Sequence, residues 1–137
     1  MSRRSTYTSR ESFRSRFEKT IAAELKAKKI DHTYEKDVIE YTVPEKRCKY
    51  TPDFKGTTSG IFLEVKGIFD LADRQKHLLI KKQYPKLDIR LVFQNANAKI
   101  TKKSKTTYAM WCDKNGIKWC HKTIPASWIK ELKQENK

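Results

Sequence analysis

The sequence predicts an α/β fold in which a mixed β-sheet is flanked by helices. Three observations support this prediction. A helical repeat of apolar residues comes early, segments rich in β-branched and aromatic residues follow, and strand-like and helix-like segments then alternate. The chain has 137 residues, which suits one domain or one half of an intertwined dimer, and 37% hydrophobic residues are enough for a core.

The first half of the chain predicts one helix and three strands. An amphipathic helix is expected over about 12–29, because apolar residues recur every four positions at Phe13, Phe17, Ile21 and Leu25. Ser15 and Glu18 have the spacing of a capping box near its start. Strands are expected over residues 34–43, 50–54 and 61–66, and Pro44 ends the first of them.

In the second half, helices and strands are expected to alternate. Asp70 can cap a helix whose apolar side would carry Leu71, Leu78 and Leu79. The next strand is reached through that helix, which indicates a parallel crossover. The expected helices cover about 71–83, 106–114 and 125–132, and the expected strands cover 87–94 and 117–121. A lysine-rich loop fills the interval 95–106.

Charge is the strongest global signal in the sequence. Thirty-one Lys and Arg residues oppose 16 Asp and Glu residues, which gives a net charge of +15. This excess favours a polyanionic partner such as nucleic acid, although a solubilising surface is the simpler alternative. No apolar run is long enough for a membrane helix, and no signal peptide is expected. Three cysteines without CxxC spacing argue against a disulfide framework and against a zinc site.

One short pattern points to chemistry. Asp53 follows a proline, and ten residues later come Glu64, Val65 and Lys66. Alternate side chains of a strand share a face, so Glu64 and Lys66 should lie on the face opposite Val65. Asp53 joins that face if a four-residue turn over 56–59 sets it opposite Phe62, whereas a five-residue turn would reverse it. The residues alone leave both turns open.

Phosphodiester cleavage would give these residues complementary tasks. Two carboxylates supply the hard oxygen ligands that Mg²⁺ prefers and leave positions for water and phosphate. The ion would polarise the phosphoryl oxygen and lower the pKa of bound water. Lys66 could orient that water or stabilise developing negative charge. A further acid could come from the first helix, where the helical wheel allows either Glu18 or Glu24.

Ordered landmarks along almost the whole chain resemble the bacteriophage endonuclease I family of Holliday-junction resolvases, within the PD-(D/E)xK nuclease superfamily. The landmarks are Phe13-Arg14-Ser15 with Glu18, Tyr50-Thr51-Pro52-Asp53-Phe54, Gly60-Ile61-Phe62 with Glu64, Lys66 and Gly67, Asp73-Arg74 with Lys76-His77-Leu78-Leu79-Ile80, Leu87-Asp88-Ile89-Arg90, and Ile124-Pro125-Ala126 with Trp128-Ile129-Lys130. The resemblance implies a restriction-endonuclease-like fold and a phage-encoded enzyme of the host cell cytoplasm that is not secreted.

The resemblance also implies an active site with two Mg²⁺ ions, for which Mn²⁺ would substitute. Asp53, Glu64 and the backbone carbonyl of Val65 would hold one ion. Asp53 and Glu18 would hold the second, and Lys66 would be the catalytic lysine. The family commonly has Thr where this chain has Val65, a change that a backbone ligand tolerates.

A domain-swapped homodimer is the third implication. Residues 1–137 would form a single nuclease domain, in which an exposed bridge near 44–49 links swapped halves 1–43 and 50–137. Glu18 of one chain would then complete a site of the other. The substrate would be branched DNA, and phosphate contacts would come from a basic surface. Its candidates are Arg3, Arg4, Arg10, Arg14, Arg16, Arg74, Lys76, His77, Lys102, Lys103 and Lys105.

Two other functions are compatible with the same residues. The fold could belong to a sequence-specific restriction-type endonuclease. Alternatively, the protein could bind DNA without cutting it, in which case Asp53, Glu64 and Lys66 would be ordinary surface charges. The three functions differ in whether cleavage occurs and in whether it depends on DNA shape.

Overall fold

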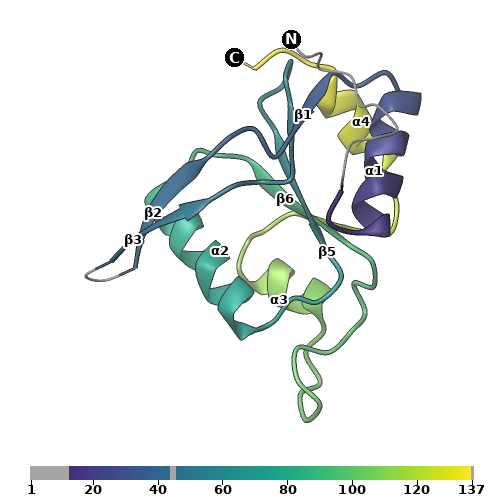
Figure 1. Ribbon diagram of the computed structural model, residues 1–137. Coiled ribbons are helices and arrows are strands. Elements are labelled where there is room, and N and C mark those ends of the chain that lie inside the picture. The colour runs from purple at the N-terminus through teal and green to yellow at the C-terminus, as the bar shows by residue number, and fades with distance from the viewer. Residues whose placement is uncertain (1–12, 44–45, 137) are drawn as a thin grey trace.

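The computed structural model describes residues 13–43 and 46–136, which form a mixed α/β architecture (Figure 1). Within them lie four helices, a five-stranded sheet and a two-stranded sheet. The expected fold class, a mixed sheet flanked by helices, is therefore confirmed. None of the helices in the described ranges is long and apolar enough to cross a membrane.

The five-stranded sheet has the order β1-β4-β5-β6-β7. Its antiparallel part contains β1 (His32–Tyr34), β4 (Phe54–Gly56) and β5 (Phe62–Lys66). Its parallel part joins β5 to β6 (Ile89–Phe93) and β6 to β7 (Trp119–His121). The expected parallel crossover between β5 and β6 is confirmed. β5 lies at the centre and borders both parts of the sheet.

Helices cover both faces of this sheet (Figure 1). One face packs against α1 (Arg16–Ala27) and α4 (Ala126–Leu132), in a core that includes Leu63 and Val65 of β5. The other face packs against α2 (Leu71–Gln83) and α3 (Tyr108–Lys114). Phe62 belongs to this second side, so the side chains of β5 alternate between the faces as expected.

A two-stranded hairpin stands beside α2. It pairs β2 (Ile39–Val43) with β3 (Lys46–Tyr50) in antiparallel register. The single strand expected over 34–43 is thus two strands, β1 and β2, which belong to different sheets. Residues 46–49 of the expected bridge are the exposed or half-exposed body of β3, and residues 44 and 45 lie outside the described part of the chain. β3 ends at Tyr50, beside the catalytic candidates.

The buried side of α2 differs from the sequence expectation. Leu71 and Leu78 are exposed and Leu79 is half-buried, whereas Ile80 is fully buried. Arg74 and His77 are the other buried residues of the helix. Arg74 donates a hydrogen bond from Nη1 to the Phe69 carbonyl at 2.7 Å, which provides a partner for its buried charge. Apolarity alone therefore indicated the wrong side, because two polar residues, Arg74 and His77, occupy the interior.

Candidate active site

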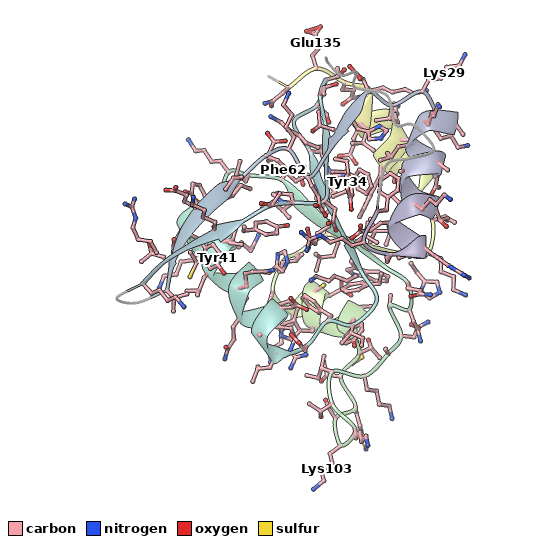
Figure 2. The ribbon with its side chains drawn as sticks, in the orientation of Figure 1. Lys29, Tyr34, Tyr41, Phe62, Lys103 and Glu135 are labelled. Carbon is pink, nitrogen blue, oxygen red and sulfur yellow. The ribbon has the colours of Figure 1, made fainter. Side chains whose placement is uncertain are left out.

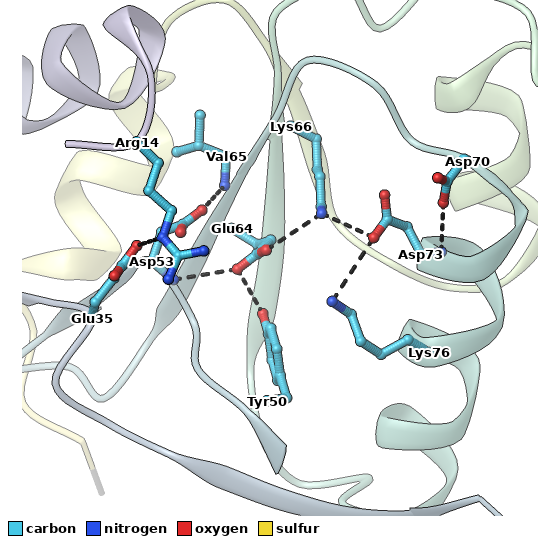
Figure 3. A network of polar contacts seen from close by, with 10 residues as sticks. All are labelled: Arg14, Glu35, Tyr50, Asp53, Glu64, Val65, Lys66, Asp70, Asp73 and Lys76. Carbon is cyan, nitrogen blue, oxygen red and sulfur yellow. Dashed lines mark hydrogen bonds and ion pairs between the residues drawn. The ribbon is translucent and has the colours of Figure 1, made fainter. Parts of the chain in front are cut away.

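A cavity of about 360 Å³ lies where α1, β1, β3, β5 and α2 approach one another. All four predicted catalytic residues line it, namely Glu18, Asp53, Glu64 and Lys66. Labels in Figure 2 mark Tyr34 and Phe62 near this part of the molecule, and Figure 3 shows the polar contacts closely. Val65 also lines the cavity. The structure thus brings together residues that are far apart in the sequence.

Hairpin geometry places Asp53 beside Glu64. Residues 57–61 separate β4 from β5, and the Gly56 N–H donates a hydrogen bond to the Ile61 carbonyl at 2.9 Å. The turn that this hydrogen bond closes has four residues, 57–60. Phe54 pairs with Leu63, and Lys55 with Phe62. The four-residue alternative is therefore the correct one, but its position is one residue later than expected. This shift moves the register by two residues, which preserves the face of Asp53.

Each acid is fixed by the backbone of the other's segment (Figure 3). Asp53 accepts a hydrogen bond at Oδ2 from the Val65 N–H at 2.8 Å. Glu64 accepts one at Oε1 from the Asp53 N–H at 3.2 Å and another from the Tyr50 hydroxyl at 2.9 Å. Both acids are buried, with relative exposures of 6% each. Buried carboxylates with fixed orientations are well suited to coordinate a cation.

Burial also changes how the two acids titrate. It raises the pKa of Asp53, with a further contribution from the adjacent Glu64 carboxylate, to about 8. Burial likewise raises the pKa of Glu64, against the opposing effect of Lys66. Close carboxylates in a dry site resist ionising together. A divalent cation would relieve this repulsion. The two carboxylates are therefore better suited to binding a metal ion than to being ionised together without one.

Lys66 lies between two carboxylates. Its Nζ is 3.7 Å from Glu64 Oε2 and 3.1 Å from Asp73 Oδ1. Burial lowers the pKa of Lys66, but Coulombic attraction to Glu64 and the hydrogen bond to Asp73 outweigh it and raise the pKa. The side chain is therefore a protonated donor at neutral pH, suited to stabilising negative charge.

Glu18 is the acid that α1 contributes. Ser15 caps the helix by accepting the Glu18 N–H at 3.0 Å, and the Glu18 carboxylate accepts the Arg14 N–H at 3.0 Å. The capping box is half confirmed, because Glu18 reaches back to Arg14 instead of Ser15. Tyr34 donates a second hydrogen bond to Glu18 at 2.6 Å. Glu24 instead accepts from the Ile124 N–H, away from this cavity.

Glu35 is a site residue that the sequence did not indicate. One carboxylate oxygen each from Glu18, Glu35 and Asp53 lies within 4.8 Å of the others. The backbone of Glu35 has φ +47°, a left-handed conformation rarely adopted outside glycine and asparagine. The Glu35 N–H donates to the Asp53 carbonyl at 2.9 Å, and Arg14 Nε lies 2.9 Å from Glu35 Oε2. The site therefore offers a second set of hard oxygen donors beside Asp53.

The predicted DNA contacts fall into four groups. Arg14 and Lys76 line the cavity, and the remaining exposed candidates lie elsewhere on the surface, namely Arg16, Lys102, Lys103 and Lys105. Arg74 and His77 are buried, which is inconsistent with direct contact to DNA. His77 packs between the rings of Tyr50 and Phe69, and burial lowers its pKa to about 3. Arg3, Arg4 and Arg10 lie outside the described residues.

Comparison with known proteins assigns the chain to a family. The sequence profile of phage endonuclease I matches residues 1–137. The chain belongs to the phage endonuclease I family. "Endonuclease I" of Escherichia phage T7 is 46% identical over 123 residues, covering 90% of this chain and 82% of the relative. "Endodeoxyribonuclease 1" of Enterobacteria phage T3 is 47% identical over 123 residues, covering 90% and 80%. Membership of an endonuclease family confirms the resemblance and disfavours the purely DNA-binding alternative.

Proposed function

We propose that this member of the phage endonuclease I family is a metal-dependent DNA endonuclease that resolves four-way and other branched junctions. The observation that carries the proposal is the convergence of Glu18, Asp53, Glu64 and Lys66 on one cavity. The names of the T7 and T3 relatives support DNA cleavage. The mixed sheet with an acidic pair and a lysine on its central strand is compatible with a restriction-endonuclease-like fold.

Mg²⁺ is the proposed cofactor, with Mn²⁺ as a substitute. Asp53, Glu64 and the Val65 carbonyl would hold one ion, and Asp53 with Glu18 would hold a second. When bound, the ions would lower the pKa of the attacking water and stabilise negative charge on the phosphate. Asp53 and Glu64 fix the ligand geometry through their backbone hydrogen bonds. Lys66 would donate a hydrogen bond to the phosphate oxygen on which negative charge develops during cleavage.

A domain-swapped homodimer in the host cell cytoplasm is part of the proposal. Residues 13–43 contact residues 50–136 through the β1–β4 pairing, through α1 packing and through the approach of Glu18 to Asp53. Each of these contacts could form between two chains with the same geometry. Resolution of a four-way junction requires two strands to be cut. A twofold dimer would present one active site to each of them.

A basic surface would select the junction by its shape. Arg14, Lys49 and Lys76 line the same cavity as the acids and can bind the phosphates next to the cut. The exposed lysines Lys102, Lys103 and Lys105 lie on a loop that projects from the body, with Lys103 near its tip (Figure 2). Cationic groups spread over several elements can follow the arms of a branched molecule.

The test of the proposed function is Glu64→Gln. We expect nicking of a four-way junction in Mg²⁺ to fall by at least about a thousandfold, because an amide is a poor ligand for this ion. Junction binding in Ca²⁺ should be retained. Glu40→Gln, which changes an exposed acid of β2, serves as the matched control and should cut normally. Cleavage by Glu64→Gln at the wild-type rate would refute the catalytic assignment.

Branch selectivity is tested with the wild-type protein and a linear duplex of the same arm sequences. The junction should be cut much faster than the duplex at equal salt concentration. Equal rates on both substrates would refute selectivity for branched DNA. Cleavage confined to one duplex sequence would instead support the restriction-type alternative.

A further inference from the structure

Lys66 has a partner outside the set of predicted catalytic residues. Asp73 Oδ1 accepts a hydrogen bond from Lys66 Nζ at 3.1 Å, which is shorter than the 3.7 Å between Nζ and Glu64 Oε2. Both members of the closer pair are largely shielded, with side-chain exposures of 16% for Lys66 and 21% for Asp73. The pair is therefore less screened by solvent than a surface ion pair.

α2 holds Asp73 in place from two directions (Figure 3). Asp70 caps this helix by accepting the Asp73 N–H at 2.9 Å, which fixes the first turn. Lys76, one turn further along, has its Nζ 3.8 Å from the same Asp73 oxygen. The carboxylate therefore lies on a rigid element and not on a loop, a placement that favours precise orientation of the group it binds.

A ring of polar and cation–π contacts surrounds the catalytic lysine and returns to it through Glu64. Lys76 Nζ lies 5.1 Å from the centre of the Tyr50 ring, and the Tyr50 hydroxyl donates to Glu64. Glu64 in turn approaches Lys66. When Glu64 serves as a metal ligand, its negative charge is shared with the cation, and Asp73 remains as the anionic partner of Lys66. Asp73 is not among the described residues that line the cavity, so it reaches the site through Lys66.

We propose that Asp73 is a positioning residue that holds the Lys66 ammonium group in the cavity during cleavage. The inference rests on the proposed function, in which Lys66 stabilises negative charge at the phosphate. A lysine has a flexible four-carbon stem and can adopt many rotamers. The hydrogen bond to Asp73 restricts that freedom and leaves the remaining ammonium hydrogens for the substrate.

The experiment compares Asp73→Ala with the wild type in single-turnover cleavage of a four-way junction. We expect the cleavage rate to fall by about 10–100-fold, as is typical for loss of a residue that orients a catalytic group. Junction affinity in Ca²⁺ and calorimetric affinity for Ca²⁺ should stay within about twofold of wild type. Asp73→Asn, which retains the shape of the side chain, should show a smaller loss of rate and guards against misfolding.

Two further variants make the result specific. Glu40→Gln removes a negative charge from an exposed position on β2, away from Lys66, so its cleavage rate should be normal. In a Lys66→Met background, followed through long time courses, Asp73→Ala should cause no further loss. Wild-type cleavage by Asp73→Ala, or an equal loss with and without Lys66, would overturn the inference. Normal cleavage by Lys66→Met would instead refute the proposed function itself.

Discussion

At the scale of single residues, the acids of the site hold protons that they would lose in the unfolded chain. The pKa of Asp53 is raised to about 8 by burial and by Glu64. Well below pH 4, the carboxyl is protonated in both states. Above that, the unfolded chain releases the proton while the folded protein retains it, so the metal-free fold loses stability until the pH passes about 8.

Asp53→Asn should remove the loss of folding stability that the metal-free protein shows as the pH rises. The variant keeps an oxygen that can accept the Val65 N–H but carries no charge. We expect its metal-free form to be more stable than wild type at pH 8, by at least the roughly 1.4 kcal/mol that one unit of pKa represents. At about pH 3 the difference should disappear. Urea denaturation in EDTA at both pH values measures it, and equal stability at pH 8 would contradict the proposed titration.

The sequence predicted some of these residues and missed others for a physical reason. Glu64 and Lys66 share one strand, so the alternation of side chains along that strand places them together. Asp53 needed the register of one local hairpin. Tyr50, Glu35 and Asp73 act through contacts between separate elements, which depend on how those elements pack. The burial of His77 was missed because its packing against Tyr50 is also tertiary. The burial of Arg74 was missed because its hydrogen bond to the Phe69 carbonyl depends on the path of the chain just before α2.

At the scale of elements, the β4–β5 loop determines whether the site can form. The sequence left open whether this turn has four or five residues, and it placed the four-residue alternative over 56–59. The structure settles the choice, since Gly60 has φ +78° while Gly56 pairs with Ile61 as the last residue of β4. Gly60 is therefore the position that needs glycine.

Gly60→Ala should destabilise the protein by about 1–2 kcal/mol, because a Cβ in the left-handed region clashes with the backbone. The added Cβ would also lie 3.2 Å from Asn136 Nδ2. Gly67→Ala is the control, since its Cβ would meet Gln94 Oε1 at an ordinary 3.4 Å. Thermal unfolding of both variants measures the effect. Equal stability of the two would show that the turn conformation costs little.

At the scale of the whole molecule, the question is how two chains would share their sites. The helix pattern, the parallel crossover and the charge of +15 were all available from the sequence. The split of one expected strand into β1 and β2 was not, because strand propensity does not report which sheet a segment joins. That split is what separates the hairpin from the sheet (Figure 1).

Shared sites can be tested by mixing two inactive proteins, Glu18→Ala and Glu64→Ala, under conditions that allow subunit exchange. If Glu18 of one chain completes the site of the other, each heterodimer has one doubly damaged site and one intact site. Nicking of a junction should therefore return to a substantial fraction of the wild-type rate. Proven exchange without recovery would show that each site is built within one chain.

The reciprocal backbone contacts of Asp53 and Glu64 have a consequence for how such a protein can diverge. Each carboxylate accepts a buried N–H, from Val65 and from Asp53 respectively. Replacement by an apolar side chain would leave that N–H without a partner, whereas Asn or Gln would retain the acceptor oxygen. A descendant that kept junction binding but abandoned cleavage is therefore expected to carry amides at these two positions.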